Sequence, residues 1–193
     1  MSKIISTFVM SVRDGIQNKY FSMKATFGGG CFWCTEIIFL NTKGILSVLP
    51  GYMGGKRENP TYEQVCSGAT GHVEVVHVEF DETLLSFPDL LAIFFKTHNP
   101  TTLNRQGEDV GTQYRSVIFY HTDDQKLQSE KMIEELSEAK VFDDPIVTAV
   151  EQAQQFWVAE DYHHNYFNRN PENPFCEAVI APKLQKYLRS NNQ

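Results

Sequence analysis

The chain has 193 residues, of which 41% are apolar and 21% charged, a composition typical of a globular protein of about one domain. Its 24 acidic and 17 basic residues give a net charge of −7 without a basic stripe, which argues against binding to nucleic acid or to an anionic membrane. No apolar segment is long enough to span a bilayer, so we expect no membrane partner.

The chain is expected to consist of an N-terminal extension, residues 1–21, and a single catalytic domain, residues 22–193. The apolar run at residues 1–10 is followed by Ser11-Val12-Arg13-Asp14 instead of the small-residue cleavage site of a signal peptide. A core of this size needs no disulfide bridges, so the four cysteines favour a reducing cytoplasm.

Strands and helices are predicted to alternate along the chain. Ser86, with Asp89 in the first turn, is a helix cap, and Thr122 with Gln125 forms a capping box. Residues 98–111 read as a long polar loop. We expect strands at about 22–27, 45–52, 71–80, 115–120 and 145–150, and helices that begin near Phe32, Thr61, Ser86, Thr122 and Pro182. This interleaving predicts the α+β class, as a two-layer sandwich.

The most informative run is Gly28-Gly29-Gly30-Cys31-Phe32-Trp33-Cys34-Thr35-Glu36. It places Cys31 after a glycine turn and at the start of a helix, where free backbone N–H groups and the helix dipole favour a thiolate. The alternative is a buried structural cysteine. Phe32 and Trp33 are core residues in the simplest interpretation, but behind an exposed thiol they form an apolar cup for a small uncharged group.

Glu74 is the second candidate for chemistry. In a strand over residues 71–80 it shares a face with Val76, Val78 and Phe80. A carboxyl on an apolar face is desolvated, which raises its pKa and allows it to donate a proton near neutrality. The alternative is a carboxylate that turns outward to water at the start of the strand.

Three further residues lie in or beside turns and loops. Tyr62 and Tyr114 each offer a phenol donor to a polar oxygen, although single tyrosines are more often packing residues. Asp109 either orients a substrate or closes a turn.

Six motifs in order resemble the type A peptide-methionine sulfoxide reductases. The similarity extends from about Lys24 to Lys186, and its motifs are Gly29-Gly30-Cys31-Phe32-Trp33, Gly51-Tyr52-Met53-Gly54-Gly55, Asn59-Pro60-Thr61-Tyr62, Val65-Cys66-Ser67-Gly68, Gly71-His72-Val73-Glu74 and the segment from Arg105-Gln106-Gly107 to Gly111-Thr112-Gln113-Tyr114-Arg115-Ser116.

The resemblance implies a role for each of these residues and a fold with a mixed sheet and a ferredoxin-like core. It implies Cys31 as the nucleophile and Glu74 as the acid. Tyr62 and Tyr114 are then donors to the sulfoxide oxygen, Asp109 orients the substrate, and Phe32 with Trp33 forms the methyl pocket. The expected products are methionine and a sulfenic acid on Cys31, which a second thiol converts to a disulfide. Thioredoxin is the expected reductant, the substrate is methionine sulfoxide in proteins or as the free amino acid, and we expect no cofactor and no metal.

The resolving thiol is Cys176 or Cys34. Cys176 lies in a tail that follows an Asn/Pro-rich segment, and in this interpretation the tail swings over the site. Members of the family that the chain resembles often carry their resolving cysteine in this tail. Cys34 is one helical turn from Cys31, with β-carbons ~5–6 Å apart in a regular helix, so pairing would require the first turn to loosen. Cys66 is expected to be structural.

Two other functions compete with this hypothesis. Cys31-Phe32-Trp33-Cys34 after a strand is also typical of a thioredoxin-like thiol–disulfide oxidoreductase. A metal-binding module would use the four cysteines or the pair His163 and His164, but no second C-x-x-C completes a tetrahedral set. The two histidines are expected to pack and cap locally.

Overall fold

A computed structural model describes residues 22–191, and the extension predicted at residues 1–21 lies outside them. The described chain forms a six-stranded sheet in the order β7-β6-β1-β3-β2-β8, beside a two-stranded ribbon β4-β5. Neighbours in the large sheet are antiparallel except β6 and β7, which are parallel, so the sheet is mixed. The strands are β1 (Ser22–Gly28), β2 (Ile45–Met53), β3 (Val73–Asp81), β4 (Arg105–Gln106), β5 (Asp109–Val110), β6 (Val117–Tyr120), β7 (Ala149–Gln152) and β8 (Trp157–Val158).

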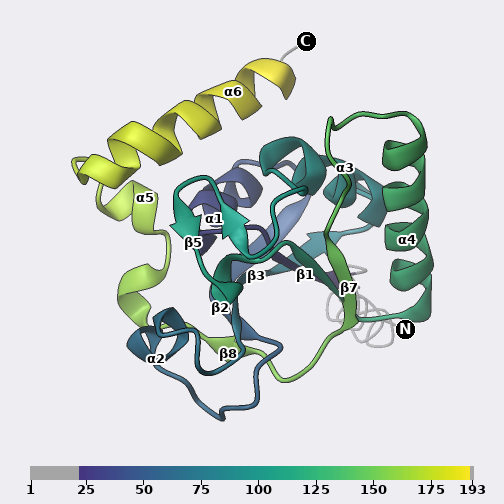
Figure 1. The fold of residues 1–193 in the computed structure, drawn as a ribbon. Helices are drawn as coiled ribbons and strands as arrows, with labels where there is room; N and C mark the ends of the chain where they lie inside the picture. Colours follow the sequence, from purple (N-terminus) through teal and green to yellow (C-terminus); the bar gives the residue numbers. More distant parts are fainter. Residues whose placement is uncertain (1–21, 192–193) are drawn as a thin grey trace, which may run out of the picture.

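The main helices cover one face of this sheet, and α6 runs along the outside of the molecule beyond α1 (Figure 1). Short 3-10 turns at Thr112–Tyr114 and Asp161–His163 and a π-helical turn at Cys176–Ile180 join the elements. The α-helices are α1 (Phe32–Leu40), α2 (Tyr62–Cys66), α3 (Phe87–Thr97), α4 (Asp123–Glu138), α5 (Tyr166–Arg169) and α6 (Ala181–Asn191).

The core lies between the sheet and the helices. Phe27 of β1 and Val76 of β3 point into it, where they meet Phe39 of α1 and Phe94 of α3. The other face of the sheet, with Val73 and Val75, is covered by the segment at residues 153–156. This arrangement confirms the predicted α+β class with a mixed sheet, whereas the closer relation to a ferredoxin-like core stays a prediction.

Two elements differ from the sequence-based prediction. The strand expected at residues 145–150 begins at Ala149, because Pro145 has no N–H and the N–H of Val147 binds the carbonyl of Pro100, 2.8 Å away, in a loop instead of a strand. The loop expected at residues 98–111 contains the β4-β5 ribbon, in which Arg105 pairs with Val110.

The helix caps were predicted correctly in one case and in part in the other. Ser86 and Asp89 form the reciprocal capping box of α3. Thr122 accepts the N–H of Gln125, but the side chain of Gln125 accepts the N–H of His121 and donates to the carbonyl of Lys24, which ties α4 to β1. Among the described residues, no helix combines the length and apolar character needed to cross a membrane.

The stability of the fold is expected to depend strongly on Phe27. Its ring lies 5.5 Å from that of Phe39, 6.2 Å from Phe87 and 5.0 Å from Phe94, measured between centroids. Phe27→Ala should lower the free energy of unfolding by about 3–5 kcal/mol in urea titrations. Leu127→Ala, at a side chain that is 64% exposed, should change it by less than about 0.5 kcal/mol, and equal effects would contradict this view of the core.

Candidate active site

A glycine turn between β1 and α1 places Cys31 directly before the helix. Gly30 has a φ of +89° and packs so closely on Gln106 that a Cβ would lie 2.5 Å from its Cγ. Gln106 in turn binds the backbone of Asn99 twice, through its Oε1 and its Nε2, each at 3.0 Å. The β4-β5 ribbon therefore fixes the turn that presents Cys31.

Cys31 is the N-cap residue of α1 and has a non-helical backbone, with φ −54° and ψ 124°. Its carbonyl accepts the N–H of Cys34 at 3.1 Å, and the two thiols are hydrogen-bonded to each other. Cys31 therefore lacks the regular helical geometry that the predicted need to loosen the helix assumed, and that need stays a prediction.

The expectation of an exposed thiol at Cys31 was wrong, because Cys31 is only 9% exposed. The hydrogen bond to Cys34, burial and the neighbouring charges of Cys34 and Glu74 raise the pKa of Cys31 well above its usual value. The same hydrogen bond lowers the pKa of Cys34, and the charge of Lys183 lowers it further. The two thiols therefore shift each other's pKa in opposite directions.

The tail cysteine lies beside this pair in the structure. Cys176 is fully buried in one cluster with Cys31 and Cys34, at the start of the π-helical turn that precedes α6. Burial and the charge of Cys34 raise the pKa of Cys176. Both candidates for the resolving thiol are thus brought together with Cys31, and the tail is already folded over the pair.

Glu74 lies on the face of β3 that the alternation indicates, and it is 1% exposed. Its Oε2 accepts the N–H of Phe32 at 3.1 Å, while its Oε1 has no hydrogen-bond partner among residues 22–191. Burial raises the pKa of Glu74 to about 8, against the opposing effect of the Phe32 N–H. The carboxyl is therefore protonated at neutral pH.

Aromatic rings line the region around Phe32. Phe32 lies 6.3 Å from Tyr62 and 4.9 Å from His163, measured between ring centroids. Trp33 stacks on Tyr166 at 3.7 Å with an interplanar angle of 6°, and its Nε1 donates to His163 Nδ1 at 3.1 Å. Burial lowers the pKa of His163 to about 4, so the ring is neutral and accepts this bond.

His163 and Tyr166 are site residues that the sequence analysis missed, and His163 does more than the expected local capping. Two carboxylates, the half-exposed Glu160 and the buried Glu36, were also missed, and they bind the backbone of these walls. Glu160 accepts the N–H of Tyr62 at 2.9 Å and the hydroxyl of Tyr52 at 2.8 Å. Glu36 accepts the N–H of Asn165 at 2.7 Å. The aromatic and histidine run at residues 162–166 was the only sequence signal for this wall.

The expected oxygen donors lie near Glu74. Burial and the charge of Glu74 raise the pKa of Tyr62 and of Tyr114 well above the usual value, so both phenols stay protonated. Burial also raises the pKa of Asp109, whereas the charge of Lys183 lowers it. These three residues therefore surround the carboxyl from α2, from the 3-10 turn after β5 and from β5.

Cys66 is less buried than expected, since its side chain is partly exposed and hydrogen-bonds the phenol of Tyr62. Its structural role stays a prediction. All four cysteines are free thiols, and the described residues contain no group of three or more His, Cys, Asp or Glu side chains that could hold a metal ion.

Residues 23–193 match the family model described as peptide methionine sulfoxide reductase. The chain is 54% identical over 164 residues to the peptide methionine sulfoxide reductase MsrA of Polynucleobacter asymbioticus, covering 85% of this chain and 86% of that protein. Its identity to the MsrA of Saccharolobus solfataricus is 50% over 165 residues, 86% of this chain and 92% of that one.

Solved structures of the same family share the fold. Mxr1 from Saccharomyces cerevisiae in its reduced form superposes with a TM-score of 0.75 at 33% identity, over 80% of this chain and 89% of that one. Methionine sulfoxide reductase A of Corynebacterium diphtheriae gives a TM-score of 0.70 at 32% identity, over 79% and 76%.

Removing Cys34 should make Cys31 more acidic. In Cys34→Ser, the thiolate partner that raises the pKa of Cys31 is absent, so its alkylation by iodoacetamide should begin at lower pH than in the wild type. Mass spectrometry of the peptide at residues 25–43 over a pH series measures this shift. An unchanged or higher alkylation pKa would contradict the assigned direction of the hydrogen bond.

Proposed function

The chain belongs to the type A peptide methionine sulfoxide reductase family, and we propose that Cys31 is the nucleophile with which it reduces methionine S-sulfoxide. The observation that carries this assignment is the bond from the Phe32 N–H to Glu74. It holds a carboxyl with a pKa of about 8 against the residue that follows Cys31, which supports a proton donor close to the thiol. A thioredoxin-like disulfide oxidoreductase and a metal-binding module are not favoured, because the family match spans residues 23–193.

The reaction needs a nucleophile at sulfur and a proton at oxygen. Cys31 is proposed to attack the sulfoxide sulfur as its thiolate, after its proton has passed to the thiolate form of Cys34, whose pKa is lowered beside Cys31 and Lys183. Glu74 gives its proton to the sulfoxide oxygen, because an unprotonated oxygen is a poor leaving group. The oxygen ends on Cys31 as a sulfenic acid and the sulfide leaves as methionine.

The residues around the sulfoxide are proposed to determine which epimer the site accepts. Phe32 and Trp33 are proposed to enclose the methyl group, since Phe32 is buried and Trp33 is held by two partners. Tyr62 and Tyr114 are proposed to donate to the sulfoxide oxygen, and Asp109 to orient the backbone of the substrate. A fixed methyl pocket opposite fixed oxygen donors accepts the S epimer and excludes the R epimer.

The cysteine cluster supports a two-step resolution. Cys34 lies in hydrogen-bond contact with Cys31, so it is proposed to attack the sulfenic acid first, which forms the Cys31–Cys34 disulfide and releases water. Cys176, buried beside Cys34, is proposed to take over the bond. Thioredoxin is the proposed dithiol reductant that restores the thiols, and a reducing cytoplasm is the compartment that suits this cycle.

Glu74→Gln should slow reduction of the S-sulfoxide by about 10²–10⁴-fold, because glutamine cannot donate a proton to the oxygen. In the wild type, kcat/KM should fall as the pH rises through about 8, where Glu74 loses its proton, and this decrease should be absent in the variant. Steady-state rates with dithiothreitol measure both, with Cys31→Ser as the inactive reference. A Gln variant with the wild-type rate and pH profile would refute the role of Glu74.

The order of the resolving thiols is tested by single-residue variants. Cys34→Ser should complete one turnover, accumulate the sulfenic acid on Cys31 and cycle slowly with thioredoxin. Oxidised Cys176→Ser should contain a disulfide confined to the peptide at residues 25–43. If oxidised Cys34→Ser instead forms a Cys31–Cys176 bridge and cycles at the wild-type rate, Cys176 alone resolves the intermediate.

A further inference from the structure

A groove leads away from the two reactive cysteines toward the outside of the molecule. It has a volume of about 570 Å³ and lies between α6, the end of α3 and the β4-β5 ribbon. Cys31, Cys34 and Asp109 line one end, and Phe175 and Val179 form part of the wall. The groove therefore begins at the proposed reaction centre and continues past it.

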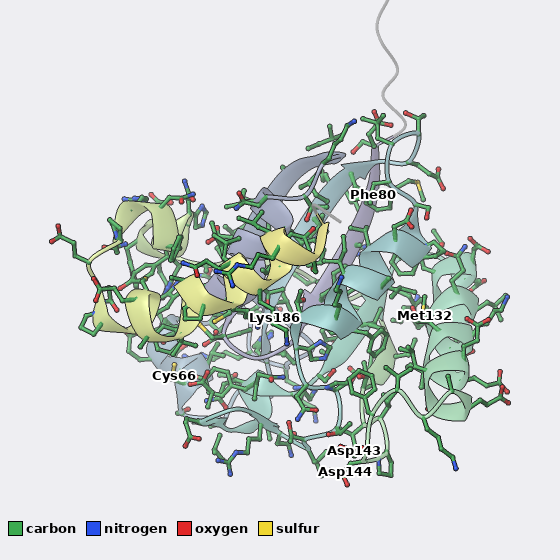
Figure 2. All side chains as sticks on the ribbon, turned by 90° about the horizontal axis from the view of Figure 1, so that it is seen from above. Cys66, Phe80, Met132, Asp143, Asp144 and Lys186 are labelled. Carbon is green, nitrogen blue, oxygen red and sulfur yellow. The ribbon has the colours of Figure 1, made fainter. Side chains whose placement is uncertain are left out.

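A second hollow of about 570 Å³ continues the groove between α3 and α4. Lys96, His98, Asn99 and Lys186 line both hollows, so the two meet at these residues. Met132, Leu136 and Phe142 give the second hollow an apolar wall, with Asp143 and Asp144 at its edge. Figure 2 labels Lys186, Met132, Asp143 and Asp144 around this path. Each hollow is in the range that encloses a drug-sized ligand, so together they are larger than one amino acid requires.

Three lysines give the junction of the hollows a positive charge in a chain whose net charge is −7. Lys96 lies in the last turn of α3, and Lys183 and Lys186 are three positions apart on α6, so they share a face. None of the three forms an ion pair with the residues that the structure describes, where the lysine pairs involve Lys24, Lys126 and Lys131. The charges of Lys96 and Lys186 are thus available to a ligand in the groove, whereas the charge of Lys183 also acts on Cys34 and Asp109.

We propose that this groove receives the polypeptide on one side of an oxidised methionine, and that Lys96, Lys183 and Lys186 select protein substrates with an acidic residue close to the sulfoxide. The inference rests on the proposed function and specifies its substrate class. With the sulfoxide at Cys31, a neighbouring segment passes Glu108 and Asp109 and reaches the lysines, where a carboxylate side chain meets Lys96 and Lys186, while the charge of Lys183 also acts on Asp109. Beyond the lysines, the negative charges of Asp143 and Asp144 limit the positive electrostatic potential to the part of the groove that the lysines line.

The contribution is expected in binding rather than in the chemical step. The lysines contact a part of the substrate that does not react, so they stabilise the ground state and the transition state equally and change KM more than kcat. A small set of partly exposed ion pairs is expected to change KM by about threefold to tenfold. This change in KM becomes smaller at high salt, because salt screens the charges.

The test compares peptides that differ only in the charge beside methionine sulfoxide. A series carries one Glu, Gln or Lys at positions from four residues before to four residues after the sulfoxide, with dithiothreitol as the reductant. The wild type should show a kcat/KM for its best Glu peptide about threefold to tenfold above that of the matched Lys peptide, through KM, and the ratio should approach one at about 0.5 M salt. Lys186→Glu and Lys96→Glu should invert this ratio. Lys24→Glu, at an exposed residue of β1 that lines neither hollow, is the matched control and should keep it.

Several outcomes would overturn the inference. Equal rates for Glu and Lys peptides in the wild type, or a ratio unchanged by Lys186→Glu and Lys96→Glu, would show that the lysines do not contact the substrate. A charge reversal that slows only thioredoxin-dependent turnover would assign the groove to the reductant. Free methionine sulfoxide serves to distinguish a failure of this inference from a failure of the proposed function. If the wild type reduces neither free methionine sulfoxide nor any peptide, the proposed function itself is wrong.

Discussion

The bond from the backbone N–H of Phe32 to the carboxyl of Glu74 connects the two halves of the site. The N–H belongs to the first turn of α1, where no helical partner exists for it, and the carboxyl lies at the buried start of β3. The bond stabilises the ionised form of Glu74, yet burial outweighs it and leaves the acid protonated at neutral pH. This contact thereby joins the strand to the helix, while burial decides the protonation state of the donor.

The pKa values of the two thiols also result from competing effects. A helix N-terminus favours a thiolate, but Cys31 is buried and faces both Cys34 and Glu74, and those interactions raise its pKa. The pKa of Cys34, one turn along the helix, is lowered instead, and Lys183 of α6 contributes to this shift. The reactive pair is therefore tuned by a residue more than 140 positions away in the chain.

Local patterns predicted those features of the molecule that depend on neighbours in sequence. Alternation along β3 placed Glu74 on the core face, and Ser86 with Asp89 marked the start of α3. The burial of Cys31 was not predictable, because the tail that contains Cys176 covers it from a distant part of the chain. The contact from Trp33 to His163 likewise joins residues that are 130 positions apart, and no periodicity encodes it.

Glu36 has a consequence for how the protein moves during its cycle. It lies in α1 just after Cys34 and binds the backbone of Asn165 and Tyr166, while Tyr166 stacks on Trp33 of the same helix. The segment at residues 163–166 is therefore clamped to α1 at two points and travels with it as one body. When Cys34 forms or breaks a disulfide, the backbone change is expected at the cap of α1 and at the tail around Cys176. Oxidised and reduced molecules should therefore share an aromatic wall of unchanged shape and differ at Gly30, Cys31 and the turn that begins at Cys176.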